Sequence, residues 1–189
     1  MRIGCVVMAA GNARRFGSNK LLTVINGKPM IQRAFDAIPA SLFDTVTVVT
    51  QYEEIAVLAA ARGYDAVINR HPDWGISHTI QLGLEAMGNM DAVMFLVSDQ
   101  PLLQRESVEA LLTFYLQQPE KIAALAHDGV RGNPCVFPAP FFPALLALQG
   151  DVGGGAVIKD HSDALRLMEV PLSQLQDIDT VQQLDILRE

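Results

Sequence analysis

Runs of hydrophobic residues alternate along this chain with segments whose hydrophobic residues recur at helical spacing. The runs at 2–10 and 92–97 are almost wholly hydrophobic, which is typical of strands buried on both faces of a parallel sheet. The segment 76–87 instead repeats hydrophobic residues three and four positions apart, which predicts an amphipathic helix. The expected strands are 2–10, 45–50, 65–69, 92–97 and 122–126, and the expected helices are 30–38, 53–62, 76–87 and 108–116.

This regular alternation over the first two-thirds of the chain predicts the fold class. It implies an α/β protein, a Rossmann-like three-layer sandwich in which helices cover both faces of a mostly parallel sheet. Prolines at 134, 138, 140 and 143 and the glycine-rich segment 150–155 then interrupt the pattern. Because no internal repeat or linker is visible, we expect a single domain over 1–189. Beyond residue 129 we expect strands at 135–137 and 165–170 and helices at 141–148 and 180–187.

Composition and charge narrow the function. The formal net charge is −7, from 14 Lys and Arg against 21 Asp and Glu. Nonspecific binding of nucleic acid needs a basic surface, so we expect no nucleic-acid partner. No hydrophobic run approaches the ~18 residues of a membrane span, so we expect no membrane partner. Cys5 and Cys135 lie far apart, and Cys5, inside a hydrophobic run, is expected to be a buried free thiol, which fits a cytoplasmic location.

The loop after the first expected strand offers groups that a triphosphate needs. Open parallel sheets bind ligands beyond the carboxyl ends of their strands, and this loop lies there. It matches neither a Walker A loop nor a dinucleotide-binding G-x-G-x-x-G. Gly11 and Gly17 would let the backbone approach phosphate oxygens, and Arg15 and Lys20 would add positive charge. From spacing alone, a solvated basic turn is an equally good interpretation.

Two carboxylates are candidates for a metal site. Asp99 is the second residue after the strand 92–97, and Mg²⁺ typically takes one or two protein carboxylates while phosphates and waters complete its octahedron. Asp179 near the C-terminus is the second candidate. Each has a structural alternative, because Asp99 can cap a turn and Asp179 can cap the last expected helix. Ser77 lies at the start of helix 76–87, where backbone N–H groups favour anions. Trp74 is expected to pack against the protein, with stacking on a ligand as the alternative.

Seven motifs, in order across nearly the whole chain, resemble nucleotidyltransferases that attach a nucleotide to molybdopterin. The segment 9–20 resembles the family's A-A-G-x-S-x-R-M-G-x-x-K, with Arg15, Gly17 and Lys20 on family positions. The other similar segments are 26–30 (G-G-K-P-L), 69–79 (N-P-D-W-x-x-G-x-x-x-S), 98–101 (G-D-Q-P), 132–134 (G-x-P), 150–153 (G-D-x-G) and 177–180 (D-I-D-T-P). The Ala-Ala-Gly at 9–11 resembles the molybdenum cofactor cytidylyltransferase branch more than the guanylyl branch, which reads L-A-G-G.

This resemblance implies a nucleotide-diphospho-sugar transferase-like fold and a Mg²⁺-dependent reaction. CMP would move from CTP to the terminal phosphate of molybdopterin or the molybdenum cofactor, with release of pyrophosphate. The recipient of the product would be a molybdenum hydroxylase of the xanthine dehydrogenase type. The implied residues are Lys20, Arg15 and Asp99 for catalysis, Ala9, Ala10, Gly11, Gly17, Ser77, Asn133 and Asp151 for binding, and Asp99 and Asp179 for the metal.

Three positions depart from the family pattern. Ala13 replaces the serine of the first loop, and Ser98 replaces the glycine before the metal-binding aspartate. The family often has Gly-Ala-Arg after G-D-x, where this chain reads Gly-Gly-Gly-Ala at 153–156. The missing arginine keeps two alternatives open: transfer to another phosphate acceptor, or a non-catalytic protein that binds and inserts the molybdenum cofactor. A nicotinamide oxidoreductase has little support, because no dinucleotide fingerprint follows the first strand.

Overall fold

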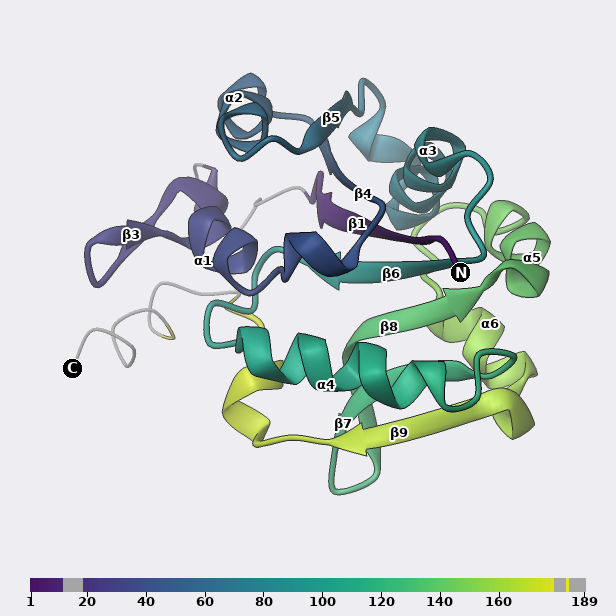
Figure 1. Ribbon diagram of the computed structural model, residues 1–189. Helices are drawn as coiled ribbons and strands as arrows, with labels where there is room; N and C mark the ends of the chain where they lie inside the picture. The colour runs from purple at the N-terminus through teal and green to yellow at the C-terminus, as the bar shows by residue number, and fades with distance from the viewer. Residues whose placement is uncertain (12–18, 179–182, 184–189) are drawn as a thin grey trace.

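A seven-stranded sheet, in the order β5-β4-β1-β6-β8-β7-β9, forms the centre of the part of the chain that the computed structural model describes, residues 1–11, 19–178 and 183 (Figure 1). β5, β4, β1 and β6 are parallel to one another, and β9 is parallel to β7. Only β8 runs antiparallel to both of its neighbours. The expected mostly parallel sheet is therefore confirmed. The strands are β1 Ile3–Ala9, β4 Thr45–Thr50, β5 Asp65–Ile68, β6 Ala92–Val97, β7 Ile122–His127, β8 Val130–Pro138 and β9 Leu165–Glu169.

Helices cover both faces of this sheet. One hydrophobic cluster joins the sheet to α1, α2 and α4, and a second joins it to α3, α5 and α6. The expected three-layer sandwich is thus confirmed. The α-helices are α1 Met30–Asp36, α2 Glu53–Ala61, α3 Ile76–Met87, α4 Arg105–Leu116, α5 Phe142–Leu146 and α6 Gly155–Asp160. The 3-10 helices are η1 Lys20–Leu22, η2 Ala40–Leu42, η3 Pro72–Trp74, η4 Ala139–Phe141, η5 Ser162–Ala164 and η6 Leu172–Leu175.

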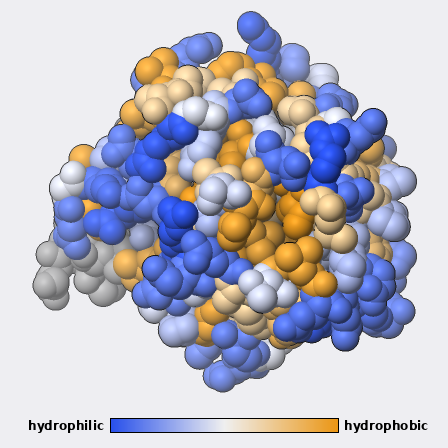
Figure 2. Space-filling view, in the orientation of Figure 1, coloured by the Kyte–Doolittle hydropathy of each residue, from blue (hydrophilic) through white to orange (hydrophobic). Residues whose placement is uncertain are grey.

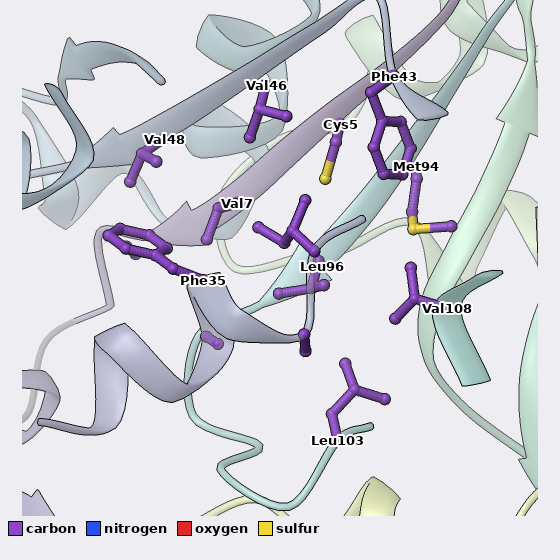
Figure 3. Packing of buried hydrophobic residues seen from close by; sticks show 14 of the residues in the cluster. Cys5, Val7, Phe35, Phe43, Val46, Val48, Met94, Leu96, Leu103 and Val108 are labelled. Carbon is purple, nitrogen blue, oxygen red and sulfur yellow. The ribbon is translucent and has the colours of Figure 1, made fainter. Parts of the chain in front are cut away.

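The continuous hydrophobic run of β1 follows from this layering. Cys5 and Val7 belong to the first cluster, whereas Val6 between them belongs to the second. Figure 3 shows Phe35 of α1 and Leu96 of β6 in the same cluster as Cys5 and Val7. Each such side chain stabilises the fold by about 1.5–3 kcal/mol when fully buried. Since both faces of the strand are covered, a polar side chain on either face would lose its hydrogen bonds to water.

Two hairpins and one short helix differ from the sequence prediction. β8 begins at Val130, five residues before the expected strand, because Asp128 and Gly129 adopt positive φ values of 49° and 73° and turn the chain back from β7. Asn26 and Gly27 turn the chain in the same way between β2 (Val24–Ile25) and β3 (Lys28–Pro29). Helix α6, which begins at the last of the three glycines, Gly155, is absent from the sequence prediction. The expected helix at 180–187 falls outside the described residues, apart from residue 183.

Hydrophilic side chains dominate the rim of the molecule. On the face shown in Figure 2, hydrophobic residues gather at the centre, and most of the residues around them are hydrophilic. Asp36 of α1 forms ion pairs with Lys28 and Arg62, all three partly exposed.

Within the described ranges, none of the helices is both long enough and apolar enough to cross a bilayer.

Candidate active site

The carboxyl ends of β1, β4, β5 and β6 lie at one edge of the sheet, because these strands are parallel. A cavity of about 580 Å³ opens there. This volume is within the ~300–1,000 Å³ typical of sites for small organic ligands. The residues that line it are Met8, Ala10, Gly11, Lys20, Leu21, Pro72, Asp73, Gly75, Ile76, Thr79, Val97, Ser98, Asp99 and Asp151. The position of the site therefore follows from the strand topology.

An ion pair between Lys20 and Asp99 lies in the wall of this cavity. Lys20 Nζ donates to Asp99 Oδ2 at 2.8 Å, and the two side chains are only 15% and 24% exposed. Lys20 Nζ also donates to the backbone oxygen of Ile178 at 3.1 Å, and the N–H of Ile178 donates to the backbone oxygen of Asp99 at 3.0 Å. Partial burial strengthens such charge-assisted contacts. Three segments far apart in sequence thus meet at one cation and one carboxylate.

Polar side chains hold the ends of the strands in place beneath the cavity. Ser98 is buried, and its hydroxyl donates to the backbone oxygen of Met8 at 2.9 Å, which ties β6 to β1. The Gln51 amide donates to the backbone oxygen of Ala10 at 2.9 Å. The hydroxyl of the serine that replaces the family's glycine before Asp99 therefore has a hydrogen-bond partner, and its role is structural.

The opposite wall depends on a close contact between two loops. Gly75 has φ 88° and ψ −177°, a conformation that is almost restricted to glycine. A Cβ atom at this position would lie 2.3 Å from the carbonyl carbon of Gly150 and 2.6 Å from the nitrogen of Asp151. The backbone N–H of Ser77 donates to the Gly150 oxygen at 3.2 Å. These contacts place Asp151 in the cavity wall, beside the start of α3.

A second cavity of about 170 Å³ borders the first, since Met8, Ile76 and Val97 line both. Asn133 and Cys135 of β8 contribute to its wall, as does Arg131. Burial raises the pKa of the Cys135 thiol, although the adjacent Arg131 guanidinium opposes this shift. Both cysteines are free and buried, which confirms the expectation for Cys5.

The structure brings together part of the predicted site. Ala9 and Ser77 are buried next to the main cavity but line neither cavity, and Asn133 lines the smaller one. Within the ranges that the structure describes, acidic, His and Cys side chains nowhere gather in a group of three that could hold a metal. The predicted residues that line the main cavity are Ala10, Gly11, Lys20, Asp99 and Asp151. Those outside the described residues are Arg15, Gly17 and Asp179, together with Ala13.

Sequence reasoning was wrong about one residue near the site, Trp74, and missed one residue that lines the smaller cavity, Arg131. Trp74 does not pack into the protein: it is 54% exposed and stacks on His71, with ring centroids 4.2 Å apart and planes at 11°. Arg131 was not considered at all, because it precedes the strand expected at 135–137. The Asp-Gly pair at 128–129 is the signal that would have extended that strand backwards to include it.

The comparisons with known proteins agree with this geometry. Residues 5–165 match the family described as the MobA-like NTP transferase domain. The chain belongs to the MobA-like NTP transferase family. The resemblance drawn from the motifs is therefore confirmed at the level of the family. Membership also establishes the reaction class, which is nucleotidyl transfer from a nucleoside triphosphate.

Individual relatives extend the match over the whole chain. The purine catabolism protein PucB of Bacillus subtilis (strain 168) is 28% identical over 197 residues, which cover 97% of this chain and 94% of PucB. The structure of Rv0371c from Mycobacterium tuberculosis H37Rv has a TM-score of 0.84 at 21% identity and covers 100% of this chain and 98% of that one. Its complex with manganese has a TM-score of 0.79 at 21% identity and covers 99% and 98%.

A further structural relative has been solved with CTP bound. CMP:2-keto-3-deoxy-manno-octonic acid synthetase, complexed with CTP, has a TM-score of 0.76 at 18% identity and covers 100% of this chain and 97% of that one. At such low identity the structural likenesses bear on the fold alone. They confirm that this MobA-like protein has the nucleotide-diphospho-sugar transferase-like fold.

Proposed function

We propose that this protein transfers CMP from CTP to the terminal phosphate of molybdopterin or the molybdenum cofactor and releases pyrophosphate. The observation that carries the proposal is the Lys20–Asp99 pair, which combines a cation for phosphates with a carboxylate for a metal inside one cavity. With no triphosphate bound, the two charges neutralise each other. When a triphosphate and its metal bind, the phosphates would pair with Lys20 and the metal would pair with Asp99. Each of the two side chains would therefore have a partner of opposite charge with and without the ligand.

The donor groups in the cavity fit Mg²⁺. A hard cation of this kind needs only one or two protein carboxylates when phosphates and waters fill its other positions, and Asp99 provides the first. We propose Asp179 as the second ligand, because the preceding residue, Ile178, is hydrogen-bonded to both Lys20 and Asp99. The manganese complex of Rv0371c supports a divalent ion in a protein of this fold. When bound, Mg²⁺ would neutralise charge on the triphosphate oxygens.

The reaction forms a bond from an acceptor phosphate oxygen to the α-phosphorus of CTP. The bond from that phosphorus to the bridging oxygen breaks, and pyrophosphate leaves with the electron pair. A phosphate monoester has a second pKa near ~6, so it is mostly dianionic at neutral pH and needs no strong base. Repulsion between the two anions is the main obstacle, so positioning and positive charge provide the catalysis. Lys20 and Arg15 would donate hydrogen bonds to the departing phosphates.

The relatives support different parts of this proposal. The cytidine donor in this proposal rests on the Ala-Ala-Gly at 9–11, and a protein of the same fold has been solved with CTP bound. Xanthine is a purine, so a recipient enzyme of the xanthine dehydrogenase type would agree with the purine catabolism in the name of PucB. We also propose that residues 1–189 act as one domain in the cytoplasm. Transfer to another phosphate acceptor is the second candidate, because glycines occupy 153–155 where the family has Gly-Ala-Arg.

A pyrophosphate-release assay tests the proposal. Purified protein is incubated with Mg²⁺ and molybdenum cofactor, with CTP or GTP as the donor. We expect release with CTP to exceed release with GTP at least tenfold, and no release without the acceptor. Release with a sugar phosphate but not with molybdopterin would favour the second candidate. Cofactor binding with no release under any condition would favour a non-catalytic carrier.

A further inference from the structure

The guanidinium of Arg131 faces the smaller cavity with few partners. Its Nη1 donates at 3.4 Å to the backbone oxygen of Gly132 and at 3.5 Å to Cys135 Sγ, both long contacts. Among the described residues, its Nε and Nη2 donate no hydrogen bond, and no carboxylate oxygen lies within 4.0 Å. A half-buried cation whose five N–H donors are largely unused is arranged to bind an anion.

Gly155 provides the space that this guanidinium occupies. A Cβ atom at position 155 would lie 2.8 Å from Arg131 Nη2, closer than real Cβ contacts. Position 155 is also where the Gly-Ala-Arg of the family places its arginine when it is aligned with 153–155. Because position 155 is a glycine, the guanidinium of Arg131 from β8 can lie directly beside the start of α6.

The surroundings of Arg131 define the chemistry of the anion. The cavity is small, about 170 Å³, so it accommodates one group of a ligand and not a whole nucleotide. Its other lining residues are mainly apolar, and it borders the cavity that holds Lys20 and Asp99. A ligand that fits both features is a phosphate monoester whose carbon skeleton has an apolar face.

We infer that Arg131 binds the phosphate of the acceptor in this protein, in the role that position 155 leaves vacant. The inference rests on the proposed function for the identity of the acceptor, but the anion site itself is defined by Arg131, Gly155 and the cavity. It explains how the acceptor end can work without an arginine in α6. It also assigns to β8 a residue that sets acceptor affinity.

Three variants test this inference. Arg131→Ala removes the cation. Gly155→Ala keeps the arginine but pushes its flexible end away, and alanine favours helix over glycine, so this variant should fold. Arg131→Ala combined with Gly155→Arg moves the cation to α6. Arg105→Ala is the control, because Arg105 lies exposed on α4 and pairs with Glu109.

Two measurements are made on the whole protein. The first is binding of phenyl phosphate, a dianionic monoester with a flat apolar ring, by calorimetry without CTP or metal. The second is KM for molybdenum cofactor in the pyrophosphate assay. Arg131→Ala and Gly155→Ala should weaken phenyl phosphate binding and raise this KM roughly 10- to 100-fold, with KM for CTP unchanged. The double variant should recover most of both losses, and Arg105→Ala should match the wild type.

Different results would refute the role of Arg131 and the proposed transferase function. Unchanged phenyl phosphate binding and unchanged acceptor KM in Arg131→Ala would overturn the role of Arg131, while pyrophosphate release would still support the transferase. A wild-type protein that does not bind phenyl phosphate would overturn the role of Arg131 as well. Arg131-dependent binding of phenyl phosphate without any pyrophosphate release would instead confirm the anion site and refute the proposed function.

Discussion

Gly75→Ala tests whether the contact between two loops holds the wall of the active site. The backbone of Gly75 has φ 88° and ψ −177°, where a residue with a side chain carries about 1–3 kcal/mol of strain. The new Cβ atom would lie 2.3 Å from the carbonyl carbon of Gly150. Because carbon atoms normally approach no closer than about 3.5 Å, the loops must separate by more than ~1 Å.

The separation also breaks the hydrogen bond from Ser77 N–H to the Gly150 oxygen, which contributes about 0.5–1.5 kcal/mol. Together with the strain, the free energy of unfolding should fall by roughly 2–4 kcal/mol. In a protein of this size, each 1 kcal/mol shifts Tm by about 2–4 °C, so Tm should fall by roughly 5–15 °C. Since Asp151 moves with the loop, turnover should also fall, by up to about 100-fold.

Thermal unfolding and pyrophosphate release are measured for Gly75→Ala and for Gly63→Ala. Gly63 also has a positive φ, 76°, but a Cβ atom there would meet nothing within 4 Å. Gly63→Ala should therefore lose only the backbone strain, about 1–2 kcal/mol, and keep full turnover. Equal losses of Tm in the two variants, or full activity in Gly75→Ala, would refute the role of the contact.

Other properties follow from burial and charge. Burial raises the pKa of Cys5 to about 12, so iodoacetamide at pH 8 should label Cys5 only after unfolding; rapid labelling of Cys5 in the native protein would contradict this. Burial disfavours the Asp36 carboxylate, but hydrogen bonds and charges from Lys28 and Arg62 outweigh this and lower its pKa. The wild type should therefore be more stable than Asp36→Asn near pH 6, with the difference vanishing as the pH falls below 3.8; a pH-independent difference would refute it. Lys20→Ala should lower the rate of the chemical step about 100- to 1,000-fold in single-turnover assays, whereas an unchanged rate would place the phosphate site elsewhere.

The strands and the main cavity were predictable because they depend on local patterns. β1 and β6 are buried on both faces, and so their residues are almost all hydrophobic. Asp99 is the second residue after β6, and parallel strands bring their carboxyl ends to one edge. A residue that follows such a strand can therefore be assigned to the site from the sequence alone.

Contacts between distant loops were not predictable in this way. Gly75 needs glycine because of Gly150, and Arg131 reaches the space above Gly155, yet neither pair shares a periodic pattern in the sequence. From the sequence alone, the glycines at 153–155 indicate only that the arginine of the family pattern is missing. The structure adds that Arg131 of β8 lies beside Gly155, at the start of α6.

The most direct test of the central claim is pyrophosphate release by Asp99→Asn with CTP, Mg²⁺ and molybdenum cofactor. Asparagine keeps the shape of the side chain but removes the charge that would hold the metal, so release should fall roughly 1,000-fold, while the broken ion pair to Lys20 should lower Tm but leave the protein folded at the assay temperature. Asp128→Asn, in the exposed turn between β7 and β8, is the matched control and should keep full activity. An Asp99→Asn enzyme that releases pyrophosphate within tenfold of the wild-type rate would contradict the assignment of the active site.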